Sequence, residues 1–305
     1  MNHHLKPTFV ISTQSKAILF LTIICLIMSH AGQAADPTYG QLESRLIAEG
    51  FDSVRVSTLF QDERVRFIPA LVELNLVSKE FPDYYRGFLA ESQVEDGAQF
   101  LSEWRQQIET GLGRTKVPPA AVVAILKVES DLGRKSGRYP IFNTLASITL
   151  LKDSLHWVAQ FDTSGGADLE RLEKRAVRRS QWAYNELVQY LKLCDRENWD
   201  PLEVKGSWAG AIGWAQFIPS SYLRCARDGD GDGRVDPYAL QDAVASIAAY
   251  LDEAGWLPSA ASHRRALMLY NPSSAYVDCI LEYARKLSQK MGSNTGNSSG
   301  ESFNN

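Results

Sequence analysis

The sequence has little histidine and little cysteine, and this scarcity narrows the chemistry that it can support. Its 305 residues include five histidines and four cysteines. Beyond residue 34, only His156 and His263 remain. A zinc site or a histidine-dependent catalytic triad therefore has little material, and the cysteine spacing matches no metal-binding motif.

The chain also lacks an excess of basic residues. It has 32 lysines and arginines against 36 aspartates and glutamates, which gives a net charge of −4. This balance argues against nucleic acid as a partner, because domains that bind nucleic acid are usually basic. Hydrophobic residues make up 45% of the sequence, which is enough for a globular core. The length suits one large domain or two ordinary ones.

The first 34 residues have the order of a secretory signal peptide. Lys6 and Lys16 precede an apolar run over residues 17–28, and small residues follow it. This pattern predicts cleavage after Ala34 and export to the periplasm or the cell envelope. The run is short for a membrane span, so an uncleaved anchor is the less favoured alternative.

Export to an oxidising compartment leaves two alternatives for the cysteines that remain. These are Cys194, Cys225 and Cys279. They can form one disulfide and leave one thiol, or they can stay as three buried thiols.

Helical patterns dominate the rest of the chain. Residues 41–110 place apolar side chains at helical spacing, and residues 168–195 read as one long amphipathic helix. We find no long alternating strands. From Gly292 onward glycine, serine, asparagine and threonine prevail, so we expect residues 291–305 to form a disordered tail.

A predicted helix places a glutamate, Glu129, on its apolar side. Pro118-Pro119 opens this helix and Gly133 closes it. The residues that share a face with Glu129 are Val122, Ile125, Leu126 and Leu132. Because burial disfavours the charged form of a carboxyl group, such a glutamate can remain an acid near neutrality and protonate a leaving oxygen. The alternative is a structural ion pair between a buried glutamate and an arginine.

A second informative segment is rich in glycine and aromatic residues and runs from Lys205 to Ser221. Its glycines allow sharp bends or a close approach of the backbone. Ser207 and Gln216 are polar groups between the aromatic residues Trp208, Trp214 and Phe217. Aromatic faces next to amide and hydroxyl groups suit a sugar ring. A tight helix–helix contact built from small residues is the alternative.

A third segment resembles the first half of an EF-hand loop. Aspartates occupy its positions one, three and five, and glycine follows at position six. The predicted ligands are Asp228, Asp230, Asp232, the backbone carbonyl of Arg234, and Asp236. Position twelve, usually a glutamate, is Ala239, which predicts weak binding; Asp242 can replace it only if the loop is longer. A solvent-exposed acidic turn is the alternative.

Three motifs together resemble one enzyme family. Glu129-Ser130, the segment 206–221 and the segment Tyr270–Tyr276 are similar to the lytic transglycosylase B family of bacterial cell-wall enzymes. The resemblance extends from about residue 85 to about residue 287. It implies a mainly α, lysozyme-like fold. It also implies cleavage of the β-1,4 bond between N-acetylmuramic acid and N-acetylglucosamine, with release of a 1,6-anhydromuramoyl end.

The resemblance assigns roles to residues of this chain. Glu129 is then the single acid and base, and no second carboxylate is required; Asp131 points away from the face of Glu129. This differs from the usual pair of carboxylates in glycosidases. The matching substrate-binding positions are Tyr85, Arg178, Arg179, Ser207, Gln216, Tyr250, Tyr270, Asn271 and Tyr276. For the tyrosines the alternative is a core position with a satisfied hydroxyl, and for the arginines it is solvated helix charge.

The expected organisation follows from these assignments. Residues 1–34 form the signal peptide, 35–110 an N-terminal helical region, and 111–290 a lysozyme-like catalytic domain with an EF-hand-like loop at 228–239. We expect no catalytic cofactor, a structural Ca²⁺ in the loop, and a monomer. Its partners are peptidoglycan glycan strands and other cell-wall enzymes. A hydrolytic muramidase and a non-catalytic peptidoglycan-binding protein are the alternative functions.

Overall fold

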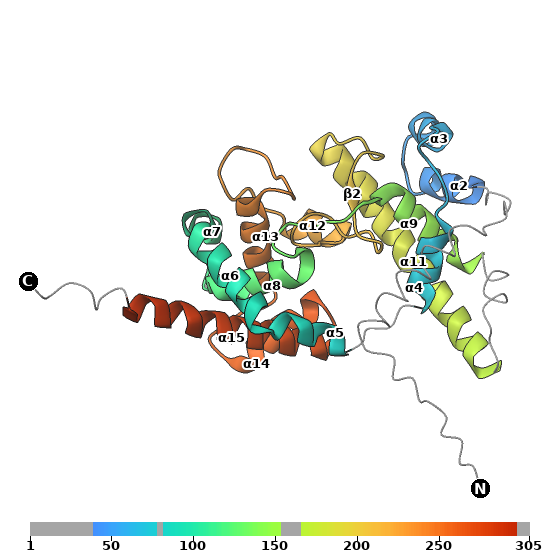
Figure 1. Ribbon diagram of the computed structural model, residues 1–305. Helices are drawn as coiled ribbons and strands as arrows, with labels where there is room; N and C mark the ends of the chain where they lie inside the picture. Colours follow the sequence, from blue (N-terminus) through green and yellow to red (C-terminus); the bar gives the residue numbers. More distant parts are fainter. Residues whose placement is uncertain (1–38, 78–81, 154–165, 298–305) are drawn as a thin grey trace, which may run out of the picture. The chain divides into compact units, whose positions relative to one another are not determined.

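The computed structural model describes residues 39–77, 82–153 and 166–297, and most of them are helical (Figure 1). This confirms the predicted mainly α class. The helices before the glycine-rich segment are α2 (Gly40–Ala48), α3 (Ser53–Gln61), α4 (Pro69–Val77), α5 (Pro82–Arg86), α6 (Glu91–Glu103), α7 (Arg105–Leu112), α8 (Pro119–Ser130), α9 (Ile141–Thr149) and α11 (Gly166–Glu197). Those after it are α12 (Pro219–Cys225), α13 (Leu240–Glu253), α14 (Ala260–Tyr270) and α15 (Ser274–Asn297). Two 3₁₀ helices, η1 (Gly87–Leu89) and η2 (Leu150–Lys152), complete the helical elements of the described ranges.

Helix α8 passes through the hydrophobic core. Its first turn contains Pro119, where a missing N–H costs no intrahelical hydrogen bond. Residues 120–127 are all buried, so the helix needs neighbours on every side. Helices α15, α6, α7 and α13 supply them, and Figure 1 shows α15 running beside α6 and α8. The helix ends where Asp131 adopts the left-handed conformation.

Helix α11 organises the other part of the described chain. Its bounds match the amphipathic pattern that predicts one long helix over residues 168–195. It packs against α9, α12 and α4. A small separate apolar cluster lies among these helices and contains Val72, Leu76, Ile148, Leu151, Ala176 and Ala183.

Two short strands hold the beginning of the glycine-rich segment. Strand β1 (Tyr139–Pro140) pairs in antiparallel fashion with β2 (Lys205–Gly206). Backbone bridges then join Gly206 to Ile212 and Ile212 to Phe217, so the segment folds back on itself. A side chain at position 206 would place its Cβ 2.0 Å from the carbonyl oxygen of Ala211. The fold therefore depends on glycine at this position.

The C-terminal helix extends further than the composition predicts. Helix α15 continues to Asn297, through the first part of the expected disordered tail. Tyr283 and Leu287 are buried, and Met291 packs on the same core one turn later, which prolongs the helical face. Residues 298–305 lie outside the described residues, as does the predicted signal peptide at 1–34.

The structure decides between the two alternatives for the cysteines. Cys194, Cys225 and Cys279 are buried free thiols. Burial raises the pKa of Cys194 to about 12 and that of Cys279 to about 11, so both stay protonated near neutrality.

Among the described helices, none is long and apolar enough to span a membrane.

Replacement of Gly206 by alanine should destabilise the fold, because the new methyl group meets a backbone carbonyl that cannot rotate away. We expect a loss of about 1–3 kcal/mol in the free energy of unfolding, the usual range for overpacking. Urea unfolding of Gly206→Ala and of the parent measures it. The control is Gly40→Ala, whose added Cβ has no heavy atom within 4 Å. Equal stabilities of Gly206→Ala and the parent would contradict the close approach.

Candidate active site

Glu129 lies in the last turn of α8, where the helix leaves the core. The residues before it on the same face are fully buried, whereas Glu129 itself is half-buried. It lines a pocket of about 410 Å³. The wall of this pocket also contains the aromatic residues Tyr84 and Phe88, and the charged residues Asp96, Lys127, Asp131, Arg134 and Lys135. The helix thus delivers one carboxyl group from an apolar interior to an accessible cavity.

Three tyrosines from different helices lie close to this carboxyl group. Desolvation raises the pKa values of the partly exposed Tyr84 and of the buried Tyr270 and Tyr276, and the charge of Glu129 is the next contribution for each. A negative charge opposes ionisation of a phenol only when it is near. Helices α5, α14 and α15 therefore converge on Glu129.

Tyr276 has an unusual hydroxyl group. Its side chain is 1% exposed, and the hydroxyl has no hydrogen-bond partner of ordinary geometry. The proximity of Glu129 nevertheless contributes to its raised pKa, through charge and through a side-chain interaction. An unsatisfied buried hydroxyl is costly. Tyr276 therefore places its hydroxyl group beside Glu129.

The tyrosine rings form a continuous row. The ring of Tyr270 lies 4.8 Å from that of Tyr250 and 6.4 Å from that of Tyr276. Tyr85 then contacts Tyr276 at a ring distance of 5.9 Å. The hydroxyl of Tyr250 donates to the carbonyl oxygen of Leu269 at 2.6 Å. Tyr250 thus fits the alternative of a core tyrosine with a satisfied hydroxyl.

The glycine-rich segment adjoins this row of rings. The hydroxyl of Tyr270 donates to the carbonyl oxygen of Ala215 within the segment. Gln216 adopts a left-handed conformation with a φ of 48°. Its amide nitrogen donates to the carbonyl oxygens of Gly213 at 2.7 Å and Ser136 at 3.1 Å. Gln216 thereby ties the segment to the loop that follows α8.

Ser207 shapes the start of the same segment. Its hydroxyl oxygen accepts hydrogen bonds from the backbone N–H groups of Ala209 at 3.2 Å and Ala211 at 3.0 Å. The side chain is half-buried and closes a local turn. In the described structure Ser207 is thus a turn-forming residue.

The remaining predicted substrate-binding residues lie on other elements. Asn271 follows the last residue of α14 and is half-buried. Arg178 is exposed on α11, whereas Arg179 packs over the ring of Trp182 at 4.0 Å and donates to the side-chain oxygen of Asn75. Burial lowers the pKa of Arg179 to about 10, so it stays charged at neutral pH.

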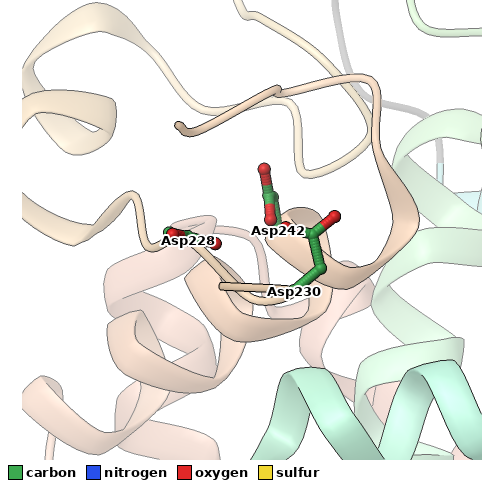
Figure 2. A group of neighbouring side chains, drawn as sticks. All are labelled: Asp228, Asp230 and Asp242. Atoms are coloured by element: carbon green, nitrogen blue, oxygen red, sulfur yellow. The ribbon is translucent and has the colours of Figure 1, made fainter. Parts of the chain in front are cut away.

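The acidic loop connects α12 to α13, and Figure 2 shows two of its aspartates, Asp228 and Asp230, together with Asp242 from the start of α13. Carboxylate oxygens of Asp228, Asp230 and Asp242 lie within 4.8 Å of one another. Asp228 accepts backbone hydrogen bonds from Gly231 at 2.6 Å and Gly233 at 2.8 Å, which shapes the turn. Oxygen ligands from several carboxylates suit a hard divalent cation such as Ca²⁺.

Asp242 is the member of this group that the loop pattern does not contain. It lies in the first turn of α13 and is 3% exposed. Its carboxylate accepts hydrogen bonds from the backbone N–H groups of Gly229 and Asp236. Burial raises the pKa of Asp242, and the charges of Asp230 and Asp228 add to this effect. A cation would relieve the repulsion, so the donor set fits a metal.

The other predicted ligands lie outside the group of three carboxylates. Asp232 accepts a hydrogen bond from the backbone of Arg234, and Asp236 accepts one from the backbone of Tyr238, both at 2.8 Å. These aspartates stabilise turns of the loop in the described structure.

Sequence reasoning did not find several residues of the Glu129 pocket. Tyr84 is 63% exposed and directly precedes the predicted Tyr85, whose side chain is buried instead. Lys127 looks like a solvated helix residue in the sequence but is 2% exposed. Asp96, its partner from α6, is 31 positions away and carries no motif.

Comparison with known sequences finds transglycosylases. A family model described as "Transglycosylase SLT domain" matches residues 34–267. Membrane-bound lytic murein transglycosylase B of Escherichia coli (strain K12) is 30% identical over 174 residues, which cover 57% of this chain and 42% of that protein. The match thus spans less than half of the relative's length.

Solved transglycosylase structures share the fold. SLT35 of Escherichia coli, in complex with calcium, matches with a TM-score of 0.64 and 22% identity, over 85% of this chain and 95% of that one. SltB3 of Pseudomonas aeruginosa, in complex with NAG-NAM-pentapeptide, matches with a TM-score of 0.64 and 25% identity, over 83% and 80%. The fold is therefore the mainly helical, lysozyme-like fold of these proteins.

The raised pKa of Asp242 predicts how stability depends on pH when divalent cations are chelated. The folded form binds the Asp242 proton more tightly than the unfolded form, whose carboxyl has a pKa of about 3.9. Stability from this group is therefore full below about pH 4 and declines as pH rises through the folded pKa. Asp242→Asn should remove this decline.

Urea unfolding between pH 4 and pH 7, with chelator, measures the difference in the free energy of unfolding between the parent and Asp242→Asn. We expect the parent to lose stability relative to the variant as the pH rises. Asp252→Asn, at the exposed end of α13, is the matched control and should follow the parent. A difference that stays constant with pH would show that the pKa of Asp242 is unshifted.

Proposed function

Because the chain belongs to the Transglycosylase SLT domain family, we propose that it is a peptidoglycan lytic transglycosylase. It cleaves the β-1,4 bond between N-acetylmuramic acid and N-acetylglucosamine and leaves a 1,6-anhydromuramoyl end. The observation that carries this proposal is the placement of Glu129, which brings one carboxyl group from the core into an accessible pocket among tyrosines.

In this proposal Glu129 acts first as an acid and then as a base. The protonated carboxyl group donates its proton to the glycosidic oxygen, and the bond from that oxygen to C1 of the muramoyl unit breaks. The Glu129 carboxylate then takes the proton of the O6 hydroxyl of the same sugar as O6 forms a bond to C1. The proton returned to Glu129 restores the acid, so no water is consumed.

The neighbouring carboxyl groups are poorly suited to serve as a second catalytic carboxylate. Partial burial alone would raise the pKa of Asp131, but hydrogen bonds from Lys127, Arg134 and Lys135 hold that pKa far below its usual range. Asp96 is held ionised by the same kind of contact with Lys127 and Arg134. Both carboxylates are engaged in ion pairs, which favours a mechanism with a single acid and base over the usual glycosidase pair.

The tyrosines and the glycine-rich segment would bind the substrate around Glu129. Tyr276 is placed to donate a hydrogen bond from its hydroxyl group to the Glu129 carboxylate when the proton has left. The proposed contacts to the sugar chain come from Tyr85, Ser207, Gln216, Tyr270 and Asn271, and those farther along the substrate come from Arg178 and Arg179. Tyr250 would act indirectly, through its packing against the ring of Tyr270. SltB3 bound to NAG-NAM-pentapeptide supports peptidoglycan as the substrate class.

The site of action that fits this substrate is the cell envelope. We propose that residues 1–34 direct export and are then removed, and that residues 111–290 form the catalytic domain. The relative in Escherichia coli is described as membrane-bound. Peptidoglycan strands are the proposed partner. The protein acts as a monomer in this proposal, and it meets other cell-wall enzymes through the shared substrate.

We also assign the acidic loop to a structural divalent cation. Asp228, Asp230 and Asp242 would provide carboxylate ligands, and the calcium complex of SLT35 supports Ca²⁺ as the metal. The cation would fix the loop between α12 and α13. It would take no part in the chemistry at Glu129.

Glu129→Gln should lose at least about 100-fold in activity, the usual scale for general acid catalysis, because an amide cannot donate the proton. Release of soluble muropeptides from purified sacculi, followed by mass spectrometry, measures this loss. Circular dichroism checks that the variant is folded. The control Glu109→Gln, on the exposed side of α7, should keep the parent rate. Near-parent activity of a folded Glu129→Gln would rule out the proposed acid.

Calcium should raise the melting temperature by mass action, because it binds only the folded loop. With no acid at position twelve of the loop, we expect a dissociation constant of roughly 10⁻⁴ to 10⁻³ M. Asp242→Asn should abolish the shift, whereas Asp252→Asn should retain it. The rate at low temperature should be the same with and without calcium. If equal magnesium produced the same shift in the parent, the loop would be an unselective acidic turn.

A further inference from the structure

An ionic cluster surrounds the end of α8 beside Glu129. The ammonium group of Lys127 lies 2.6 Å from a carboxylate oxygen of Asp96 and 2.7 Å from one of Asp131. Arg134 contacts both carboxylates, and Lys135 lies 3.2 Å from Asp131. Asp96 comes from α6, so the cluster joins two helices. Three cations and two carboxylates leave one net positive charge.

The cluster also holds an unusual backbone. Asp131 and Leu132 have φ angles of 51° and 57°, and neither residue is glycine. Two consecutive left-handed residues need support from their surroundings. Asp131 receives that support from Lys127, Arg134 and Lys135. The turn that follows Glu129 is thus held by ion pairs in addition to helix packing.

Lys127 is the least expected member of the cluster. Its side chain is 2% exposed, although it carries a charge. A buried charge is retained at a cost unless its partners compensate it. Both Lys127 and Asp131 are two residues from Glu129, and all five charged groups line the same pocket. Each charge therefore acts on Glu129 across the same partly desolvated pocket.

We propose that Lys127, Asp96 and Asp131 are positioning residues that fix the Glu129 end of α8 and balance the charge around its carboxyl group. This inference rests on the proposed role of Glu129. Loss of the positive member favours the protonated acid, and loss of a negative member favours the carboxylate. The cluster thereby sets the pH range in which Glu129 can both give and take a proton.

The other titratable groups near Glu129 are phenols from neighbouring helices. They stay neutral near pH 7, because desolvation and the charge of Glu129 oppose their ionisation. Among the described residues, the titratable groups that line the pocket, or whose rings lie in the row of tyrosines beside Glu129, are Tyr84 of α5, Asp96 of α6, Lys127 and Asp131 at α8, Arg134 and Lys135 after it, Tyr250 of α13, Tyr270 of α14 and Tyr276 of α15. Near pH 7 the phenols of this set are uncharged. The charges that a substitution can remove therefore belong to the ionic cluster.

Two substitutions of opposite charge test the proposal. Lys127→Met removes a positive charge, so the alkaline limb of the pH–rate profile should move to higher pH. Asp96→Asn removes a negative charge, so the same limb should move to lower pH. Each shift should be about half a pH unit, as expected for one charge acting through a partly solvated medium. The double variant restores the net charge and should return the limb toward the parent position.

The rates are measured on soluble uncross-linked glycan strands at saturating concentration. Lys127→Arg keeps the charge and should keep the parent limb even if kcat falls. Arg105→Met and Glu109→Gln, an exposed pair on α7, make the same charge changes elsewhere and should leave the profile in place. Asp96 is 33% exposed, so Asp96→Asn remains informative even if Lys127→Met does not fold.

The outcomes separate this proposal from the proposed function. If Glu129→Gln is inactive but the limb stays fixed, or moves the same way in both variants, the cluster is only structural and the proposal fails. If the parent does not cleave the strands, or if Glu129→Gln retains activity, the proposed function fails instead. Opposite shifts that cancel in the double variant support both.

Discussion

The central constraint is that α8 has to be buried on all sides and yet end at an accessible carboxyl group. Its apolar residues force helices α15, α6, α7 and α13 to surround it. The same packing brings tyrosines to the point where α8 ends. Of the helices that bury α8, α6 also lines the pocket at its end, and Tyr84 of α5 and Phe88 of η1 complete the apolar part of the wall.

Close backbone contacts hold the glycine-rich segment against this core. Gly206 accepts a neighbouring backbone at a distance that no side chain allows, and Gly133 lies against the ring of Trp214 in the same way. Gln216 then bridges the glycine-rich segment to the loop after α8. The polar residues of the segment thus form part of its own architecture, and any role in sugar binding must be compatible with these internal hydrogen bonds.

Sequence patterns predict the parts of the structure that depend on local spacing. The bounds of α8 follow from Pro119 and from the apolar run, and α11 follows from its amphipathic period. Long-range contacts escape such reasoning. Asp96 meets Lys127 only because α6 packs on α8. The spacing of the loop admits Asp242 as a substitute for the missing acid at position twelve. Asp242 reaches Asp228 and Asp230 only because the first turn of α13 packs against the loop.

The account makes Glu129 the acid and base of an attack by the substrate's own hydroxyl group. Digestion of peptidoglycan in water enriched in heavy oxygen tests this claim most directly, with mass spectrometry of the new muramoyl ends. The account predicts 1,6-anhydro ends that contain no label from the water. Labelled reducing ends as the main product would show that water attacks instead, and would make the protein a hydrolytic muramidase.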